Sequence, residues 1–415
     1  MTTRRRSDAP RVLYCTDTYI PQVNGVSIVT ALSVEGLRQR GWECGVITPS
    51  YPTHAYSTRA AESANFAIEI PSVAFPPYPD IRLAAPAYRT VAEAVRRFTP
   101  DIVHSATEFM IGRLGQIAAH RAGIPRLSSY HTDFSRYAEA YGFPRLRPFV
   151  SRYIARFHHR SERVYTPSAP ARDDLAAMAV RDVEVWGRGV DTHAFSPGKR
   201  SHVLRDAYGV DASVVFLHVG RLAAEKNVAV LIRAFKRACE SLPAGAARLI
   251  VAGAGPEENA LRALGGSDVM FLGVLNRERD LPRLYASADA FLFASLTETL
   301  GLVVLEAMSS GLPVVAPAAG GVADHLRHGV NGIEVPPNDV DTMATAIVAI
   351  TLDADRRRQL AAGARRTAEA LDWSEELDRL DRSYRDVLER RARSLAPSPS
   401  ARDRLREPVA NGAAG

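Results

Sequence analysis

Long apolar stretches are missing from this sequence of 415 residues. No segment approaches the roughly 20 consecutive apolar residues that a membrane-spanning helix needs. The charged start, MTTRRRSDAP, is not followed by an apolar segment of signal-peptide length, which argues against secretion. We therefore expect a cytoplasmic protein rather than an integral membrane protein or a secreted one.

Cysteine is also scarce. The chain has three, Cys15, Cys44 and Cys239; their spacing fits no metal site, and an odd number argues against a disulfide framework. No Asp-x-Asp pair stands where it would hold a metal-bound diphosphate, and DAD at 353–355 lies between helical segments, where we expect a helix start. The sequence therefore predicts no metal and fits a reducing compartment.

The GxGxxG pattern of nicotinamide-dependent enzymes is absent after the candidate strands. GAGPEEN at 253–259 lacks the third glycine, and PQVNGV at 21–26 contains a single glycine, Gly25. A nicotinamide cofactor therefore has little support.

What the sequence does contain is the composition of a soluble globular enzyme, 46% hydrophobic and 24% charged. Its length exceeds that of one ordinary core and favours two or three domains. The net charge of +6 is compatible with nucleic acid, an anionic membrane or a phosphorylated ligand, and it does not choose among them.

The same order of elements occurs twice along the chain. RVLYCTDTY at 11–19 is a buried strand that leads through a turn into a helical segment, VSIVTALSVEGLRQRG. About 200 residues later, SVVFLHVG leads through RLAAEKN into the helical segment VAVLIRAFKRACESL. Continuous apolar strands that alternate with amphipathic helices indicate parallel sheets covered on both faces. We therefore predict an α/β protein with two doubly wound domains, each binding ligand beyond the carboxyl ends of its strands.

The boundary between these domains is expected near WGRGVDTHAFSPGKRS at 186–201, which is rich in Gly, Pro and Ser and has no periodicity. The segment after residue 372 has a helical period, and the last residues are polar and rich in Pro and Ala. The predicted divisions are a disordered start at 1–10, domains at 11–192 and 193–372, a helix at 373–392 and a disordered tail at 393–415.

The segment TETLGLVVLEAMSSG at 297–311 places Glu298 and Glu306 eight positions apart. Glu298 follows a strand, DAFLFAS, while Gly301 precedes a helix whose N-terminus favours an anion such as phosphate. Two carboxylates on either side of that phosphate could accept hydrogen bonds from hydroxyl groups, and a nucleotide sugar has this shape. The alternative is one glutamate favoured by the helix dipole and one on the surface, but the apolar neighbours of Glu306 favour its burial.

Three further motifs follow predicted strands. Arg221 and Lys226 in GRLAAEKN could bind a diphosphate and neutralise it as it departs, although basic loop residues are often simply exposed. Gly25 allows a ligand to approach the backbone at a helix start. His131 in SSYHTDFSRYAEAYG could bind the transferred sugar or an acceptor, although a lone histidine is more often structural.

Together these motifs resemble the retaining nucleotide-sugar glycosyltransferases of family 4, which have the GT-B fold. The likeness covers residues 11–390 and is most specific in GRLAAEKN, GAGP and SLTETLGLVVLEAMSSGLPVVAPAAGGVADHLRHGVNGIEVPPND. TDTYIPQVNGV, SSYHTDFSRYAEAYG, TPSAPARDDL and WGRGVDTHAFSP resemble the branch with GDP-mannose-dependent α-mannosyltransferases and sulfoquinovosyl-lipid synthases.

The resemblance implies a role for each candidate residue. Glu298 would bind hydroxyl groups of the donor sugar, and Glu306 those of the ribose. Arg221 and Lys226 would hold the diphosphate, Gly25 would approach the donor phosphate from the opposite domain, and His131 would lie near the reacting sugar. Backbone N–H groups would hold sugar and phosphate along the loop formed by Thr299, Leu300, Gly301 and Leu302. The last helix would cross back to the N-terminal domain.

The function implied is metal-independent transfer of a hexosyl group, most readily mannose from GDP-mannose, to a hydroxyl acceptor with retention of configuration. Two alternatives stay open: a transferase for a UDP-sugar of glucosyl or sulfoquinovosyl type, and an inactive regulator that binds nucleotide sugars. No cofactor and no nucleic acid partner is implied. The sequence indicates neither the acceptor nor the oligomeric state.

A basic segment in the N-terminal half suggests where an acceptor would be found. RLRPFVSRYIARFHHRSER at 145–163 places Phe149, Tyr153 and Phe157 on one helical stripe beside Val150 and Ile154, with Arg152, Arg156, Arg160 and Arg163 on neighbouring faces. Such a helix can lie on an anionic membrane; alternatively, the stripe packs on the sheet and the arginines are solvated. We predict a peripheral enzyme on the inner face of the membrane with a lipid acceptor.

Overall fold

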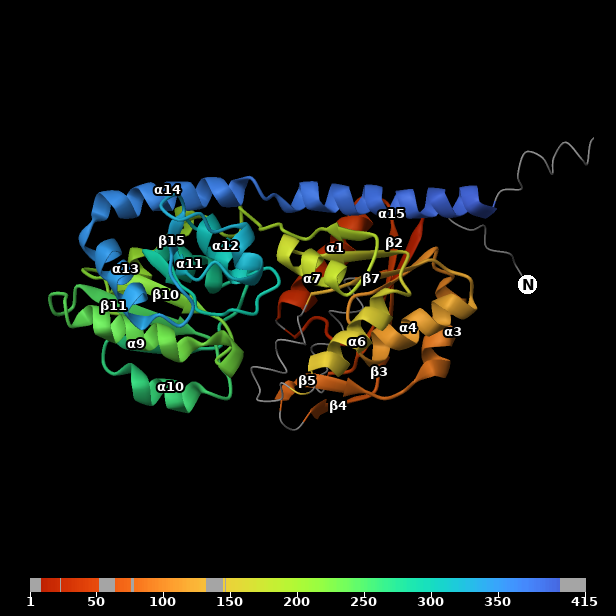
Figure 1. Cartoon of the computed structure of the whole chain (residues 1–415), viewed down its shortest axis with the longest axis horizontal. Coiled ribbons are helices and arrows are strands. Elements are labelled where there is room, and N and C mark those ends of the chain that lie inside the picture. The colour runs from red at the N-terminus through yellow and green to blue at the C-terminus, as the bar shows by residue number, and fades with distance from the viewer. Residues whose placement is uncertain are drawn as a thin grey trace, which may run out of the picture.

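The computed structural model describes residues 9–22, 24–51, 64–75, 78–131, 145 and 147–395. They form two α/β domains side by side, each with helices around a parallel sheet (Figure 1). This is the predicted doubly wound architecture.

The N-terminal sheet has seven strands in the order β3-β2-β1-β6-β7-β8-β9, all in parallel pairs. The strands are β1 Arg11–Cys15, β2 Glu43–Pro49, β3 Phe66–Ile70, β6 Ile102–Ser105, β7 Arg126–Ser129, β8 Arg163–Thr166 and β9 Val183–Val185. The helices are α1 Gly25–Gln39, α3 Tyr88–Phe98, α4 Met110–Arg121, α6 Arg147–His158 and α7 Ala169–Ala177, and an antiparallel hairpin joins β4 Ser72–Phe75 to β5 Tyr78–Ala84.

The C-terminal sheet has six strands in the order β12-β11-β10-β13-β14-β15, again parallel. They are β10 Val214–Val219, β11 Ala247–Ala252, β12 Val269–Gly273, β13 Ala290–Leu292, β14 Val314–Ala316 and β15 Gly332–Glu334. The helices are α8 His202–Ala207, α9 Val228–Cys239, α10 Glu258–Gly265, α11 Leu281–Ser287, α12 Leu302–Ser309, α13 Val340–Leu352 and α14 Ala354–Glu369.

Each sheet changes winding direction at one point. In the first sheet β1 lies between β2 and β6, and in the second β10 lies between β11 and β13. Loops leaving the carboxyl ends of two such neighbours diverge and open a crevice, which is where doubly wound domains bind ligands. The loops after β10 and β13 carry Arg221 and Glu298, so the topology brings these two residues together.

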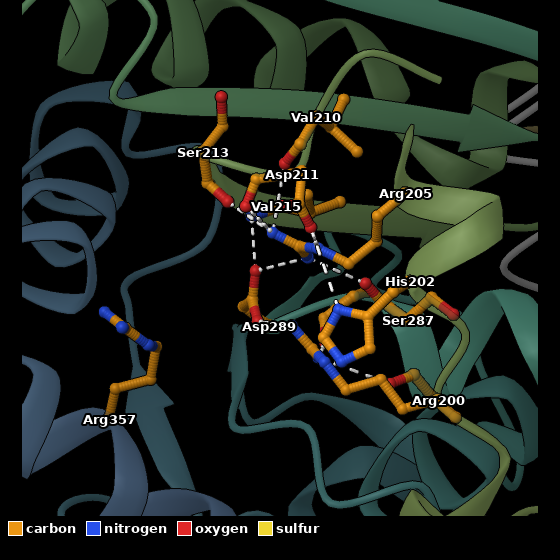
Figure 2. A network of polar contacts seen from close by, with 12 residues as sticks. Arg200, His202, Arg205, Val210, Asp211, Ser213, Val215, Ser287, Asp289 and Arg357 are labelled. Atoms are coloured by element: carbon orange, nitrogen blue, oxygen red, sulfur yellow. Dashed lines mark hydrogen bonds and ion pairs between the residues drawn. The ribbon is translucent and has the colours of Figure 1, made fainter. Parts of the chain in front are cut away.

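A buried arginine fixes the start of the C-terminal domain (Figure 2). Arg205 of α8 is 4% exposed, and its guanidinium pairs with Asp289 at 2.9 Å and donates to the carbonyls of Ser287 at 2.9 Å and Ser213 at 2.7 Å. Asp289 also accepts from the backbone N–H of Val215 at 2.8 Å. These hydrogen bonds tie α8 to the strands β10 and β13.

The last helix, α15 Trp373–Leu395, returns to the N-terminal domain, along which it runs in Figure 1. Its buried side chains pack with the core around β1, and the Trp186 indole donates to the Glu376 carbonyl at 2.6 Å. The contact with α1 is close, because a Cβ added at Gly36 would collide with Leu377.

Two predicted boundaries change. The helix α15 ends at Leu395 rather than at 392, so residues 393–395 are helical and not part of a disordered tail. At the other end the Pro10 carbonyl accepts from the Glu43 N–H at 2.9 Å, so residues 9 and 10 are ordered. The predicted disorder of residues 1–8 and 396–415 falls outside the described residues.

The basic helix predicted at 145–163 is shorter than expected, and its aromatic side chains are exposed in the first part and buried in the second. The helix α6 covers Arg147–His158, with Phe149 72% and Tyr153 42% exposed but Ile154 and Phe157 buried in the core. Arg163 belongs to β8 instead, where it is buried and pairs with Asp386 of α15 at 3.0 Å. The aromatic stripe therefore faces solvent only in its first half. Within the described ranges, no helix combines the length and apolar character required to cross a membrane.

Candidate active site

The loop that carries Glu298 is held by a second glycine-containing loop. The backbone N–H of Gly321 donates to the Glu298 carbonyl at 2.7 Å, and a Cβ at Gly320 or Gly321 would collide with the carbonyls of Glu298 or Thr299. Only glycine permits this approach. This glycine pair was not predicted, although the sequence AAGGV at 318–322 could have indicated it.

The loop that carries Glu298 ends at Gly301, the N-cap of α12. The φ of Gly301 is 75°, a left-handed conformation that favours glycine. Leu300 and Leu302 are buried in the core, so their side chains stabilise the loop and only their backbone can face a ligand. The first N–H groups of α12 have no partner within the helix. The N-terminus of α12 thus suits an anion.

The predicted cation and carboxylate form an ion pair. Lys226 Nζ donates to Glu298 Oε1, and both side chains are largely buried. Burial by itself would raise the pKa of Glu298, but the charge and the hydrogen bond of Lys226 bring that pKa below its usual value. Glu298 is therefore a carboxylate that can accept hydrogen bonds from hydroxyl groups.

Arg221, in the loop after β10, also pairs with a buried carboxylate. Its Nη2 donates to Oε1 of Glu225, a carboxylate with no exposed surface, while the arginine keeps 27% of its side chain exposed. The Glu225 carbonyl accepts from Ser295 Oγ at 3.2 Å, which links the loop after β10 to the loop after β13. Arg221 is thus positioned by a buried acid and is still accessible to an anion.

Glu306 is buried and each of its carboxylate oxygens accepts a hydrogen bond, which rules out the surface alternative. It is 2% exposed, its Oε1 accepts from Arg277 Nη2, and its Oε2 accepts from the Tyr285 hydroxyl at 3.1 Å. Burial raises the pKa of Glu306, which Arg277 and Tyr285 partly counteract. Neither Arg277 nor Tyr285 was predicted.

His131 lies across the crevice, directly after β7. Its backbone carbonyl accepts a hydrogen bond from Thr299 Oγ1, which connects the two domains. Burial, together with the neighbouring His158, lowers the pKa of His131 to about 4. The imidazole is therefore neutral near pH 7, and it could bind a sugar hydroxyl without carrying charge.

Gly25 is the first residue of α1 and is exposed, and a Cβ built there would meet no atom within 4 Å. Nothing in the described protein thus demands glycine at this position. One turn later, Ile28 packs against the core of the C-terminal domain, so Gly25 stands near the domain interface. The absence of a side chain keeps the start of α1 open to a ligand.

A small pocket lies between the domains beside Glu298. Thr297, Glu298, Thr299 and Gly320 line one side, and the N-terminal domain contributes Tyr130, Ser168, Pro170, Ala171 and Asp174. Asp324 closes the crevice nearby, since it accepts from the Ala169 N–H at 2.9 Å and pairs with Arg188 at 3.0 Å.

Two buried acids of the N-terminal domain were not predicted. Asp17, after β1, accepts from Thr107 Oγ1 at 2.6 Å and from the Ile111 N–H at 2.8 Å, so it caps α4. Glu108, after β6, is 2% exposed and lies 3.3 Å from His158 Nε2. Both acids stand at the carboxyl ends of strands, but no motif in the sequence marked them.

Metal ligands do not gather in the described part of the chain: no group of three or more His, Cys, Asp and Glu side chains could hold an ion there. Arg221 and Lys226 are two cations whose charges act on Glu298 in this crevice.

Two doubly wound parallel-sheet domains that face each other across a crevice have the arrangement of the GT-B fold. A solved structure, "Crystal structure of Anabaena Alr3699/HepE in complex with UDP and glucose", superposes with a TM-score of 0.74 at 20% identity, covering 91% of this chain and 100% of that one. At that identity the likeness concerns the fold.

The chain belongs to glycosyltransferase family 4. Residues 23–194 match the family described as Glycosyltransferase Family 4, and residues 213–353 match Glycosyl transferases group 1. A Mycobacterium tuberculosis protein named GDP-mannose-dependent alpha-mannosyltransferase is 32% identical over 93% of this chain and 99% of its own length. The alpha-monoglucosyldiacylglycerol synthase of Streptococcus pneumoniae is 31% identical over 74% of this chain and 70% of its own length.

Proposed function

We propose that this enzyme transfers mannose from GDP-mannose to a lipid hydroxyl, with retention of configuration and without a metal. The observation that carries the proposal is the Lys226–Glu298 pair beside the N-terminus of α12. This pair combines a cation for the diphosphate with a carboxylate for the sugar. The extended similarity to a GDP-mannose-dependent enzyme supports the choice of donor.

The chemistry follows from charge and position. The bond between the sugar carbon C1 and the phosphate oxygen breaks, and the acceptor oxygen forms a new bond to C1 on the same face. The acceptor proton passes to a phosphate oxygen. Arg221, Lys226 and the N–H groups of α12 stabilise the negative charge that grows on the leaving diphosphate, while Glu298 and His131 orient the sugar.

The lipid acceptor is supported by an exposed apolar patch on the N-terminal domain. The Tyr153 hydroxyl of α6 donates to the Glu108 carbonyl, which places Tyr153 close to the exposed Phe109 and Met110 at the start of α4, and the exposed Phe149 lies one turn before Tyr153 on α6. Arginines at positions 145, 147, 152 and 156 of the same segment are also exposed. Aromatic residues among arginines suit an anionic membrane surface, and a relative's name refers to a diacylglycerol lipid.

A thermal-shift comparison of nucleotides tests the choice of donor. A ligand at 100 times its Kd stabilises the folded state by about 2.7 kcal/mol, so GDP and GDP-mannose should raise the Tm more than UDP, ADP or their sugars at equal concentration. An excess of chelator should leave the shift unchanged. A larger shift with UDP-glucose would favour the second candidate, a UDP-sugar transferase of glucosyl type, which the 31% identity to an alpha-monoglucosyldiacylglycerol synthase supports.

A further inference from the structure

Arg277 stands on a rigid loop between β12 and α11. The Asn276 side-chain oxygen accepts from the N–H groups of Glu278 at 3.0 Å and Arg279 at 2.8 Å, and the Asn276 N–H donates to Asp280 at 3.2 Å. The loop is thus fixed by its own hydrogen bonds on both sides of residue 277.

The Arg277 guanidinium uses few of its donors. It binds Glu306 through Nη2 and lies 5.3 Å from the ring centroid of Phe195, with 24% of its side chain exposed. Nε and Nη1 make no hydrogen bond to any residue in the described part of the chain. Since a guanidinium has five N–H donors and no acceptor, most of its capacity is available to a ligand.

Glu306 is 2% exposed, so ribose hydroxyl groups reach its carboxylate only if a side chain that covers it moves. Each of its oxygens already accepts one hydrogen bond, from Arg277 or from Tyr285. Tyr285 has no exposed surface and is packed in the core, whereas Arg277 is partly exposed on a surface loop. When ribose hydroxyl groups bind Glu306, Arg277 is therefore the partner that must give way.

We propose that Arg277, released from Glu306 by the ribose, turns to the nucleotide base and selects guanine. Guanine carries two neighbouring acceptors, O6 and N7, which match the fork of a guanidinium. Adenine places an amino donor beside N7, and uracil separates its two carbonyl oxygens by an N–H donor, so neither fits an all-donor group as well. This inference rests on the proposed GDP-mannose function, and it identifies Arg277 as the side chain that selects GDP.

The test compares the affinities of GDP and UDP by calorimetry in the wild type, in Arg277→Met and in Arg279→Met. Arg279 belongs to the same loop, its side chain is 80% exposed, and among the described residues its guanidinium pairs with its neighbour Asp280 alone, so it serves as the matched control. In Arg277→Met the preference for GDP over UDP should fall about tenfold or more, while UDP affinity is kept or improved. Arg279→Met should keep the wild-type preference.

A modified nucleotide extends the test to the wild-type protein. 7-Deaza-GDP lacks the N7 acceptor, so it should bind the wild type more weakly than GDP, and this difference should vanish in Arg277→Met. Equal wild-type affinities for GDP and 7-deaza-GDP would overturn the assignment, even if Arg277→Met failed to fold.

The remaining outcomes separate the two proposals. A wild type that prefers GDP, together with an unchanged preference in Arg277→Met, overturns only the role of Arg277. An equal loss of both nucleotides in that variant also overturns it, because Arg277 would then merely position Glu306. A wild type that prefers UDP overturns the GDP-mannose function as well.

Discussion

Glu298 lies in the loop before α12 and Glu306 lies within the helix, and their surroundings differ. Glu298 faces the interdomain pocket and pairs with Lys226, whereas Glu306 is enclosed by Arg277 and Tyr285. A group that contacts the transferred sugar affects the chemical step, whereas one that contacts only the ribose affects binding. Their substitutions should therefore have different kinetic effects.

We predict that Glu298→Gln lowers kcat strongly and leaves GDP affinity nearly unchanged. Glu306→Gln should weaken GDP binding by about 1.5–3 kcal/mol, the cost of losing hydrogen bonds to a charged group. Calorimetry with GDP and initial rates with the donor measure the two effects, and Glu240→Gln on the exposed end of α9 is the control. Equal GDP affinity in the wild type and Glu306→Gln would contradict the ribose assignment.

His218 gives a prediction about stability against pH. It is buried on β10, where burial and then the charge of Lys226 lower its pKa to about 4, although its hydrogen bond to the Leu292 carbonyl acts in the opposite direction. An unfolded chain binds this proton near pH 6.5, but the folded chain does not until about pH 4. The histidine therefore costs stability as the pH falls between these values, by about 1.4 kcal/mol per pH unit.

Comparison with His218→Asn isolates this effect. The free energy of unfolding of the wild type, minus that of the variant, should decrease from pH 6.5 to pH 4 and stay constant above pH 7. Chemical denaturation at several pH values measures it. A difference that is independent of pH would show that His218 titrates equally in both states.

At the scale of elements, the contact between α1 and α15 joins the end of the chain to the first domain. A Cβ at Gly36 would collide with Leu377, so Gly36→Ala should destabilise the protein by about 1–3 kcal/mol through overpacking. Leu377→Ala removes the obstacle, and the double variant should cost less than the sum of the single variants. Urea denaturation measures all three. Strict additivity would mean that α15 does not rest on Gly36.

The exposed half of α6 is the predicted membrane contact. Phe149→Ala with Tyr153→Ala should reduce sedimentation with anionic vesicles, because the aromatic rings no longer enter the interface. Val203→Ala, which removes an equally exposed apolar side chain on the C-terminal domain, is the control. If the wild type sediments equally with anionic and neutral vesicles at low salt, the enzyme has no affinity for a charged membrane.

Strands and helices could be predicted from the sequence more fully than the contacts between side chains of different elements. Buried apolar runs such as β1 and β10 identify strands without further information, and the switch points of the sheets then bring Arg221 to Glu298. Arg277 could not be found in this way, because it meets Glu306 across 29 positions and only the fold brings the two together. For the same reason the sequence did not predict that only part of α6 is buried. Periodicity indicates which face of the helix is apolar, but the fold decides how far along the helix that face is covered.

At the scale of the whole molecule, the two domains contact each other around the proposed donor site. Thr299 bonds the His131 carbonyl, Asp324 binds the start of α7, and Ile28 packs into the opposite core. These contacts hold the N-terminal domain against the loop that carries Glu298.

The most direct test of the account is a turnover assay with labelled GDP-mannose, vesicles of an anionic glycerolipid mixture and a chelator. We expect labelled mannose to appear in the lipid fraction as the α-anomer, with little product from UDP-glucose and almost none from Glu298→Gln. Transfer that proceeds from UDP-glucose but not from GDP-mannose, or that requires added magnesium or manganese, would contradict the account.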